Sequence, residues 1–208
     1  MNQPVDDMIS VAEAQGAVLA GVKALNAEDV SVAECFGRVL AEDVASRMTQ
    51  PPVAVSSMDG YAVRSEDVAS VPATLTLIGE SAAGGGFEGT LEAGQTVRIF
   101  TGAPVPDGAD AIVIQEDTDV DGASITMKES STKGRYVRPA GLDFSAGDTL
   151  LKSGKRLNSR DVALIAGMNV PWVSVTRRPR VAILSTGNEL VLPGEPLDRN
   201  QIISSNSI

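Results

Sequence analysis

The sequence predicts a multidomain α+β protein, in which a strand-rich domain is inserted into a helix-containing domain and the start of an α/β domain follows. Apolar residues recur at helical spacing near the N-terminus and after residue 158, short alternating runs fill the segment between, and a buried-type apolar run begins at Val181. Insertions are tolerated where chain ends lie close together. We place the helix-containing domain at 1–46 and 146–178, the inserted β domain at 47–145 and the start of the α/β domain at 179–208.

The first predicted element is a helix from about residue 11 to 24. Ser10 and Glu13 have the spacing of a capping box, in which each side chain binds the backbone N–H of the other residue. Apolar residues follow at roughly helical spacing: Val11, Ala14, Val18, Val22 and Leu25.

Two small paired strands are expected next, around Val30–Val32 and Asp43–Ala45, with a brief helical segment between them that ends near Gly37. Pro51 and Pro52 then interrupt regular structure, because proline cannot donate a ladder hydrogen bond and restricts the residue before it. We therefore place a domain boundary near this point.

The inserted domain is predicted to be rich in strands, because apolar and polar residues alternate in short runs between glycines. Asp121–Gly122 lies between two such runs, where a tight hairpin turn is expected. Glycines 84 to 86 have neither phosphate-loop spacing, so they are interpreted as a flexible loop. The predicted strands are YAVR, ATLTLIG, QTVRIF, DAIVIQE, ASITMK and RYVR.

A second helix is predicted to begin at Asn158 or Ser159 as its cap and to end at Gly167, and the run PWVSVTR that follows is typical of a strand. Val181–Leu184 is then expected to form a buried strand, followed at once by a polar glycine turn. One such strand cannot cover both of its faces, so we expect residues 179–208 to open a truncated domain.

Composition indicates a soluble globular protein. The hydrophobic fraction of 43% is ordinary, and no run of 18 apolar residues occurs in the 208-residue chain. The acidic N-terminus lacks the pattern of a signal peptide, and Cys35 is the single cysteine, so no disulfide forms within the chain. We expect a cytoplasmic location.

Charge and residue types narrow the chemistry. The formal net charge of −10 and the lack of any Lys/Arg-rich run argue against nucleic-acid or membrane partners. The sequence contains no histidine, which excludes serine–histidine triads and histidine-ligated zinc. Carboxylates, hydroxyls, amides and backbone groups remain, a set suited to Mg²⁺ and to phosphate-bearing ligands.

Three stretches place Ser or Thr, Gly and a carboxylate or amide at strand ends: SSMDGYAV, IFTGAPVPDGADAIV and ILSTGNEL. Asp59–Gly60 is first of all typical of a turn, because glycine tolerates positive φ. Thr101–Gly102 and Ser185–Gly187 each follow a predicted strand, where hydroxyls and free N–H groups tend to meet ligands. Each pattern taken alone also fits an ordinary turn.

Taken together, these stretches resemble the molybdopterin molybdotransferase family, known as MoeA in bacteria and as the gephyrin E domain in animals. The resemblance covers most of residues 50 to 208, through PPVAVSSMDGYAVR, IFTGAPVPDGADAIVIQED, RYVRPAGLDFSAGDTLLKSGKRL, VALIAGMNVPWVSVTRRPRVAILSTGNEL and IISSNSI. It implies an elongated helix-containing domain, an inserted β domain, an α/β molybdopterin-binding domain and a final β domain. The third is then incomplete here and the fourth absent.

The resemblance implies insertion of molybdate into adenylylated molybdopterin with release of AMP, giving molybdenum cofactor in a Mg²⁺-dependent transferase reaction. It also implies a homodimer, with the adenylyltransferase of the preceding step as a further partner. The incomplete chain is then expected to be inactive by itself. Two alternatives stay open: a non-catalytic scaffold of the gephyrin type, and a generic nucleotide-binding enzyme, which the lack of a P-loop opposes.

Functional positions follow from the same resemblance. Asn188 stands where the family often has Asp, so an amide replaces a charged ligand. Arg135 and Arg138 offer cationic forks for molybdate or phosphate, and a surface ion pair is an equal alternative for Arg135. By motif, the resemblance implies functional positions at four residues that we predict to be catalytic: Asp59, Thr101, Asp143 and Glu189. From their chemistry we predict the substrate-binding residues Ser185, Thr186, Gly187, Asn188, Arg138, Ser205 and Asn206, and the metal ligands Glu189 and Asp59.

Overall fold

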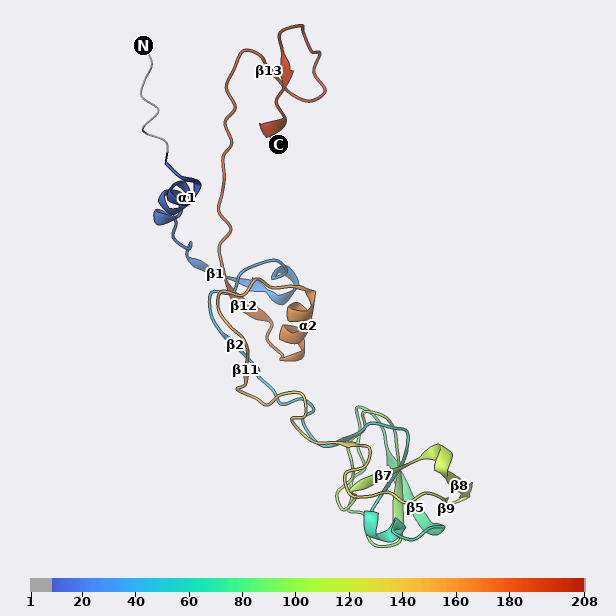
Figure 1. Ribbon diagram of the computed structural model, residues 1–208. Coiled ribbons are helices and arrows are strands. Elements are labelled where there is room, and N and C mark those ends of the chain that lie inside the picture. Colours follow the sequence, from blue (N-terminus) through green and yellow to red (C-terminus); the bar gives the residue numbers. More distant parts are fainter. Residues whose placement is uncertain (1–8, 208) are drawn as a thin grey trace. The chain divides into compact units, whose positions relative to one another are not determined.

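The computed structural model describes residues 9–207 (Figure 1). The chain divides into two units, Asp29–Val175 and a second unit that joins Met1–Glu28 to Thr176–Ile208. The described residues are rich in strands and include two α-helices, which agrees with the mixed α and β content of the predicted fold class.

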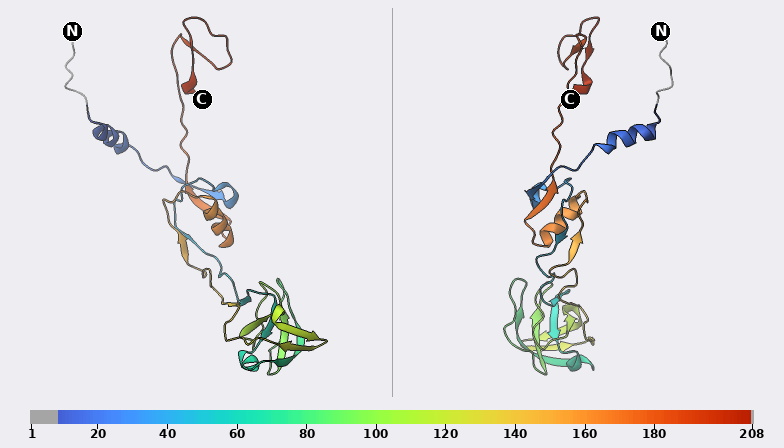
Figure 2. Two further views of the ribbon diagram at one scale, coloured as in Figure 1. Left: turned by 45° about the vertical axis from the view of Figure 1, so that its right-hand side comes forward. Right: turned by 90° about the vertical axis from the view of Figure 1, so that its left-hand side faces the viewer.

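A six-stranded sheet forms the largest element of the unit 29–175, drawn mostly in green in Figures 1 and 2. In spatial order the strands are β7 (Ala111–Ile114), β4 (Gly60–Val63), β6 (Gln95–Ile99), β5 (Ala73–Ser81), β9 (Ser124–Met127) and β8 (Thr118–Asp121). Strand β4 is antiparallel to both of its neighbours, β6 and β7. Strand β5 is parallel to β6 and antiparallel to β9, which pairs with β8.

Both faces of this sheet bury apolar side chains. Tyr61 and Val63 of β4 belong to one hydrophobic cluster, whereas Ala62 between them belongs to another on the opposite face. A strand covered on both faces has few polar positions, which explains the short, nearly continuous apolar sequence of β4 and β7.

The hairpin prediction at Asp121–Gly122 is confirmed. Asp121 pairs with Ser124 at the end of the β8–β9 ladder, and Gly122 has φ 57°, a left-handed conformation that glycine adopts without strain.

A second core lies around helix α2 (Ser159–Gly167). Asn158 caps this helix by accepting hydrogen bonds from the N–H groups of Arg160 and Asp161, as predicted. Cys35 is fully buried here, and its Sγ lies 3.1 Å from the carbonyl oxygen of Val32. The buried residues of this core are Cys35, Leu40, Val44, Phe144, Leu151, Leu157, Ile165, Met168, Val170, Val173 and Val175.

The prediction that the two N-terminal strands pair with each other is wrong. Strand β1 (Ala27–Ser31) pairs with β12 (Trp172–Thr176), and β2 (Val44–Ala45) pairs with β11 (Thr149–Leu151). Each short strand therefore finds its partner more than 100 residues later in the chain. Strands β3 (Val55–Ser56) and β10 (Val137–Arg138) also pair, and they are separated by a shorter stretch of chain. The intervening 3₁₀ segments are Val32–Glu34, Ser65–Val68 and Gln115–Asp117.

The second unit contains helix α1 (Val11–Ala20) and the parallel strand pair β13 (Leu190–Val191) and β14 (Ile202–Ile203), followed by a 3₁₀ segment, Ser205–Ser207. The predicted capping box at the start of α1 is confirmed, since Ser10 and Glu13 each bind the other's backbone N–H. The helix stops at Ala20 with Gly21 as its C-cap, earlier than the expected residue 24.

The strand predicted at Val181–Leu184 does not form. This segment is in no ladder, and the side chains of Val181, Ile183 and Leu184 are 76%, 60% and 86% exposed. Its backbone has no neighbouring strand within the described residues to pair with, and strand geometry depends on such a neighbour.

Among residues 9–207, no helix is both long enough and apolar enough to span a membrane.

Candidate functional site

Sheet topology brings three chain segments together beside Asp59. Because β4 runs antiparallel to β6 and β7, the start of β4 lies at the same sheet edge as the ends of β6 and β7. Gly60, the first residue of β4, is opposite Ile99 on one side and Ile114 on the other. The residues that precede β4 and follow its two neighbours are therefore adjacent in space.

Asp59 and Thr101 form a hydrogen-bonded pair at this edge, although 42 residues separate them in the chain. The backbone N–H of Thr101 donates to Asp59 Oδ1 at 2.7 Å, and the Thr101 hydroxyl is within hydrogen-bond distance of the same oxygen at 2.8 Å. These two hydrogen bonds and the positive charge of Arg98 hold the pKa of the Asp59 carboxyl below its usual value. Asp59 is exposed and ionised at neutral pH, with Oδ2 free of bonds in the described chain.

A glycine is required at position 60 because the backbone of β7 lies very close to it. The interpretation of Asp59–Gly60 as a positive-φ turn is wrong. Gly60 begins a strand, and its φ is not positive. A Cβ at this position would collide with the carbonyl oxygen of Val113 and lie 2.9 Å from Cα of Ile114. The glycine therefore lets β7 lie against the start of β4.

A second polar pair is formed by Arg138 and Asp143. Nη2 of Arg138 lies 3.1 Å from both carboxylate oxygens of Asp143, and both side chains are nearly half exposed. Arg138 pairs with Val55 of β3, while Ser56 of β3 donates its N–H to the carbonyl oxygen of Ala103. The two polar pairs thus lie on the two sides of β3. In residues 9–207 no hydrogen bond or ion pair joins one pair to the other.

Arg135 is not in an ion pair within the described chain. Its guanidinium donates to the carbonyl oxygen of Ser130 at 3.0 Å and lies over the ring of Tyr136, 5.1 Å from the centroid. The Tyr136 hydroxyl is the main cause of a raised pKa for Arg135. Arg135 therefore carries a permanent positive charge near the sheet.

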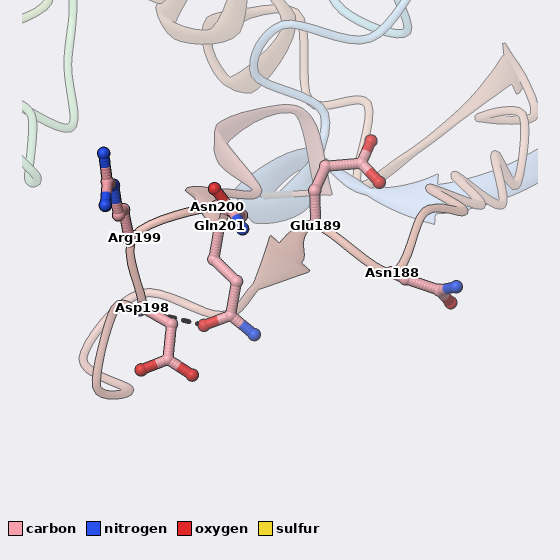
Figure 3. A pocket seen from close by; sticks show the side chains of 6 residues that line it. All are labelled: Asn188, Glu189, Asp198, Arg199, Asn200 and Gln201. Atoms are coloured by element: carbon pink, nitrogen blue, oxygen red, sulfur yellow. Dashed lines mark hydrogen bonds between the residues drawn. The ribbon is translucent and has the colours of Figure 1, made fainter.

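The remaining predicted residues lie in the second unit. Figure 3 shows Asn188 and Glu189 at a hollow of about 650 Å³, together with Asp198, Arg199, Asn200 and Gln201. Parallel pairing explains the grouping, because Glu189 precedes β13 and Gln201 precedes β14, so both lie at the N-terminal ends of the two strands. The N–H of Asp198 donates to Gln201 Oε1 at 3.0 Å (Figure 3).

The flanking predicted residues lie at different ends of this strand pair. Ser185, Thr186 and Gly187 precede β13, and a Cβ on Gly187 would come within 2.5 Å of the Glu189 carboxylate oxygens. Ser205 and Asn206 follow β14, so they lie at the opposite end of the pair from Glu189.

Residues 9–207 contain no group of three or more acidic or sulfur ligands that could hold a metal ion. Asp59 and Glu189 lie in different units of the chain. Mg²⁺ in other proteins is often held by one or two carboxylates together with substrate phosphates, an arrangement that an exposed single carboxylate permits.

Sequence reasoning did not single out Arg98, Gln115 or residues 198–201. Arg98 interrupts the apolar residues of QTVRIF, and a charged residue inside a buried strand is a signal that was available. Residues 198–201 carry no comparable pattern, because only the β13–β14 pairing brings them to Glu189.

Comparisons with known proteins identify the family. The family model described as MoeA N-terminal region (domain I and II) matches residues 9–168. A molybdopterin molybdenumtransferase from Nostoc sp. is 42% identical over 174 residues, which cover 82% of this chain and 40% of that protein. Molybdopterin molybdenumtransferase 2 from Mycobacterium tuberculosis is 38% identical over 205 residues, covering 97% and 51%. The chain thus spans about half the length of the curated relatives it matches.

Two solved structures of the molybdopterin biosynthesis MoeA protein from Pyrococcus horikoshii share the fold. One has a TM-score of 0.86 at 31% identity and covers 94% of this chain and 54% of its own. The other has a TM-score of 0.79 at 34% identity and covers 96% and 52%. With the profile match over residues 9–168, these similarities show that the chain belongs to the MoeA N-terminal region family.

Proposed function

We propose that this protein acts in molybdenum cofactor biosynthesis, in the insertion of molybdate into adenylylated molybdopterin with release of AMP. Relatives named molybdopterin molybdenumtransferase support the transferase class. The observation that carries the proposal is the Asp59–Thr101 pair, which places an ionised carboxylate and a hydroxyl at one exposed sheet edge.

In this proposal Asp59 orients the reacting water or a bound cation at the adenylyl phosphate. Thr101 occupies Oδ1 of the carboxylate with two hydrogen bonds, so Oδ2 faces the substrate with a defined direction. Arg138 offers a guanidinium to an anionic oxygen when substrate displaces Asp143, because its fork matches phosphate and similar oxyanions. Positioning of this kind supplies a large part of catalysis in phosphoryl transfer.

We propose that the Glu189 region binds molybdopterin. Its hollow is lined by amide groups, two carboxylates and Arg199, which together suit hydrogen bonding to a polar, phosphate-bearing ligand. Ser185, Thr186, Gly187, Ser205 and Asn206 are proposed as further donors. A Mg²⁺ ion, held by Asp59 or Glu189 and by substrate phosphates, would neutralise phosphate charge.

Further proposals concern assembly and location. We propose a cytoplasmic homodimer that receives its substrate from the adenylyltransferase of the preceding step. The domain division at 1–46 with 146–178, 47–145 and 179–208 is retained as a proposal. The 47–145 domain is supported by the hydrophobic clusters. The two clusters of the six-stranded sheet are separate from the core around α2.

The test measures AMP release from adenylylated molybdopterin by the complete gene product, with and without molybdate and Mg²⁺. Asp59→Asn keeps the size of the side chain but loses the charge, and we expect release to slow by about 100-fold or more. Asp107→Asn, an exposed aspartate outside the pair, is the matched control and should keep the wild-type rate. A wild-type rate for Asp59→Asn would refute the role of Asp59, and no release by the wild type would refute the enzyme assignment and favour a binding module.

A further inference from the structure

Arg98 contacts two aromatic rings at the sheet edge that carries Asp59. It is directly opposite Tyr61 in the β4–β6 register, and its Cζ atom lies 5.0 Å from the centroid of the Tyr61 ring. The ring of Phe100 is on the same guanidinium at 4.9 Å. Two cation–π contacts restrict the side chain to a narrow range of directions.

The guanidinium also fastens three strand ends together. Nη1 of Arg98 in β6 donates to the carbonyl oxygen of Gly60 in β4 at 3.2 Å, and Nη2 donates to Oε1 of Gln115 after β7 at 2.5 Å. The N–H of Gln115 in turn donates to the carbonyl oxygen of Asp59 at 3.1 Å. A closed set of hydrogen bonds therefore holds the two backbone carbonyls that directly follow the Asp59 side chain.

Thr101 depends on the same strand end. It follows Phe100, whose ring contacts Arg98, and both of its donors must reach Asp59 Oδ1 across the gap between β4 and β6. Asp59, Thr101 and Gln115 are all exposed, so little packing holds them in place. Arg98 is partly buried and is the group that connects all three segments.

We propose that Arg98 is the positioning residue of the Asp59–Thr101 pair: its planar guanidinium, in contact with the rings of Tyr61 and Phe100, fixes the start of β4 relative to the ends of β6 and β7 so that Thr101 meets Asp59 Oδ1. The positioning of Thr101 and Asp59 by Arg98 does not depend on the proposed function, and only the effect of Arg98 on catalysis rests on it. Lysine cannot replace the guanidinium, because a single ammonium lacks the planar fork that reaches two acceptors while it stacks.

The first experiment measures hydrogen exchange and the chemical shift of the Thr101 amide by NMR in the 208-residue chain, without substrate. Arg98→Gln and Arg98→Lys should both speed exchange of this amide by about tenfold and move its shift, because a hydrogen bond to a carboxylate is weakened. Arg64→Gln is the control, since Arg64 follows the other end of β4 and forms an exposed ion pair with Glu66. It should leave the Thr101 amide unchanged.

A second variant covers the case in which the Arg98 substitutions unfold the sheet. Gln115→Ala changes an exposed residue and removes one of the two acceptors of Arg98, so we expect a smaller change in the same direction at the Thr101 amide. The proposal would be overturned if the Thr101 amide of Arg98→Gln kept the exchange rate and chemical shift of the wild type. If only Gln115→Ala folds, the same result in that variant would overturn it. Full recovery in Arg98→Lys would also overturn it, because charge alone would then suffice.

The second experiment measures AMP release by the complete gene product. Arg98→Gln should lower kcat by roughly tenfold to a hundredfold with little change in KM, since a displaced catalytic group slows the reaction after substrate has bound. An unchanged kcat with a disturbed Thr101 amide would overturn the catalytic part. If the wild-type protein releases no AMP, the proposed function fails, whereas the NMR result still decides whether Arg98 positions the pair.

Discussion

Replacing Asp161 with alanine tests how the cap of α2 supports the core around that helix. Asp161 is 6% exposed, and its two carboxylate oxygens accept hydrogen bonds from Lys155 Nζ at 2.7 Å and from the N–H of Asn158 at 3.0 Å. Its own N–H donates to Asn158 Oδ1 at 3.1 Å, which completes a capping box. Alanine keeps only the last of these bonds and leaves the N–H of Asn158 and the ammonium of Lys155 without their acceptor.

The expected cost follows from these contacts. The N-cap bonds of Asn158 persist in alanine, so the cost comes from the two hydrogen bonds to the carboxylate. Loss of a hydrogen bond to a charged group costs about 1.5 to 3 kcal/mol. The side chain of Lys155 is 44% exposed, so water compensates part of its loss. We therefore expect Asp161→Ala to lower the free energy of unfolding by about 2 kcal/mol, or Tm by roughly 4 to 8 °C for a chain of this size.

The effect has a defined pH dependence. The N–H of Asn158, followed by the Lys155 ammonium, lowers the pKa of the Asp161 carboxyl in the folded protein. A carboxyl whose pKa is lower when folded contributes stability above its unfolded pKa, and this contribution is lost as pH falls through the folded pKa. The difference between the wild type and Asp161→Asn should therefore be constant near neutral pH and shrink below about pH 4.

Urea unfolding followed by fluorescence measures this prediction. Trp172 is the single tryptophan and lies in β12, next to Val173 of the same core, so it reports on that core. Lys152→Met is the matched control, because its ion pair with Asp43 is exposed and should cost less than about 1 kcal/mol. A loss below about 0.5 kcal/mol in Asp161→Ala, or a difference for Asp161→Asn that persists unchanged in acid, would refute the reasoning.

Two further predictions concern packing. Gly60→Ala should lower the free energy of unfolding in urea by about 1 to 3 kcal/mol, because the added Cβ collides with β7. Gly16→Ala in α1 is the control, since a Cβ there meets open space and should be neutral or slightly stabilising. Equal changes in the free energy of unfolding for the two variants would contradict the close approach of β7 to Gly60. Burial raises the pKa of the Cys35 thiol, so native protein at pH 8 should react with a thiol reagent far more slowly than urea-unfolded protein. Reaction at the unfolded rate would show that Cys35 is accessible.

Local features of this chain were predictable because the residues that determine them are neighbours. The two capping boxes join residues that are three apart in the chain. The Ser10–Glu13 box forms as predicted, and the Asn158–Asp161 box forms at the predicted helix cap. The Asp121–Gly122 hairpin likewise depends on a short turn between two adjacent strands. The resemblance in short motifs also led to the correct family.

Features that depend on distant partners were harder to predict. The apolar run Val181–Leu184 is typical of a buried strand, yet it forms no ladder within the described residues. Strands β1 and β2 pair with segments more than 100 residues away, which neither sequence indicates. The role of Gly60 was also misread, because the carbonyl of Val113 that requires a glycine belongs to another strand.

For the candidate site, the sequence by itself identified the residue types: a carboxylate before one strand and a hydroxyl after another, in a protein without histidine. Only the tertiary structure decided which of these side chains meet. Asp59 and Thr101 share a hydrogen bond, and Arg138 forms an ion pair with Asp143. Arg98 connects three strand ends. Short-range patterns specify helices, turns and strands through neighbouring side chains. Strand order and register arise from contacts across the whole sheet, so they determine which of those side chains meet.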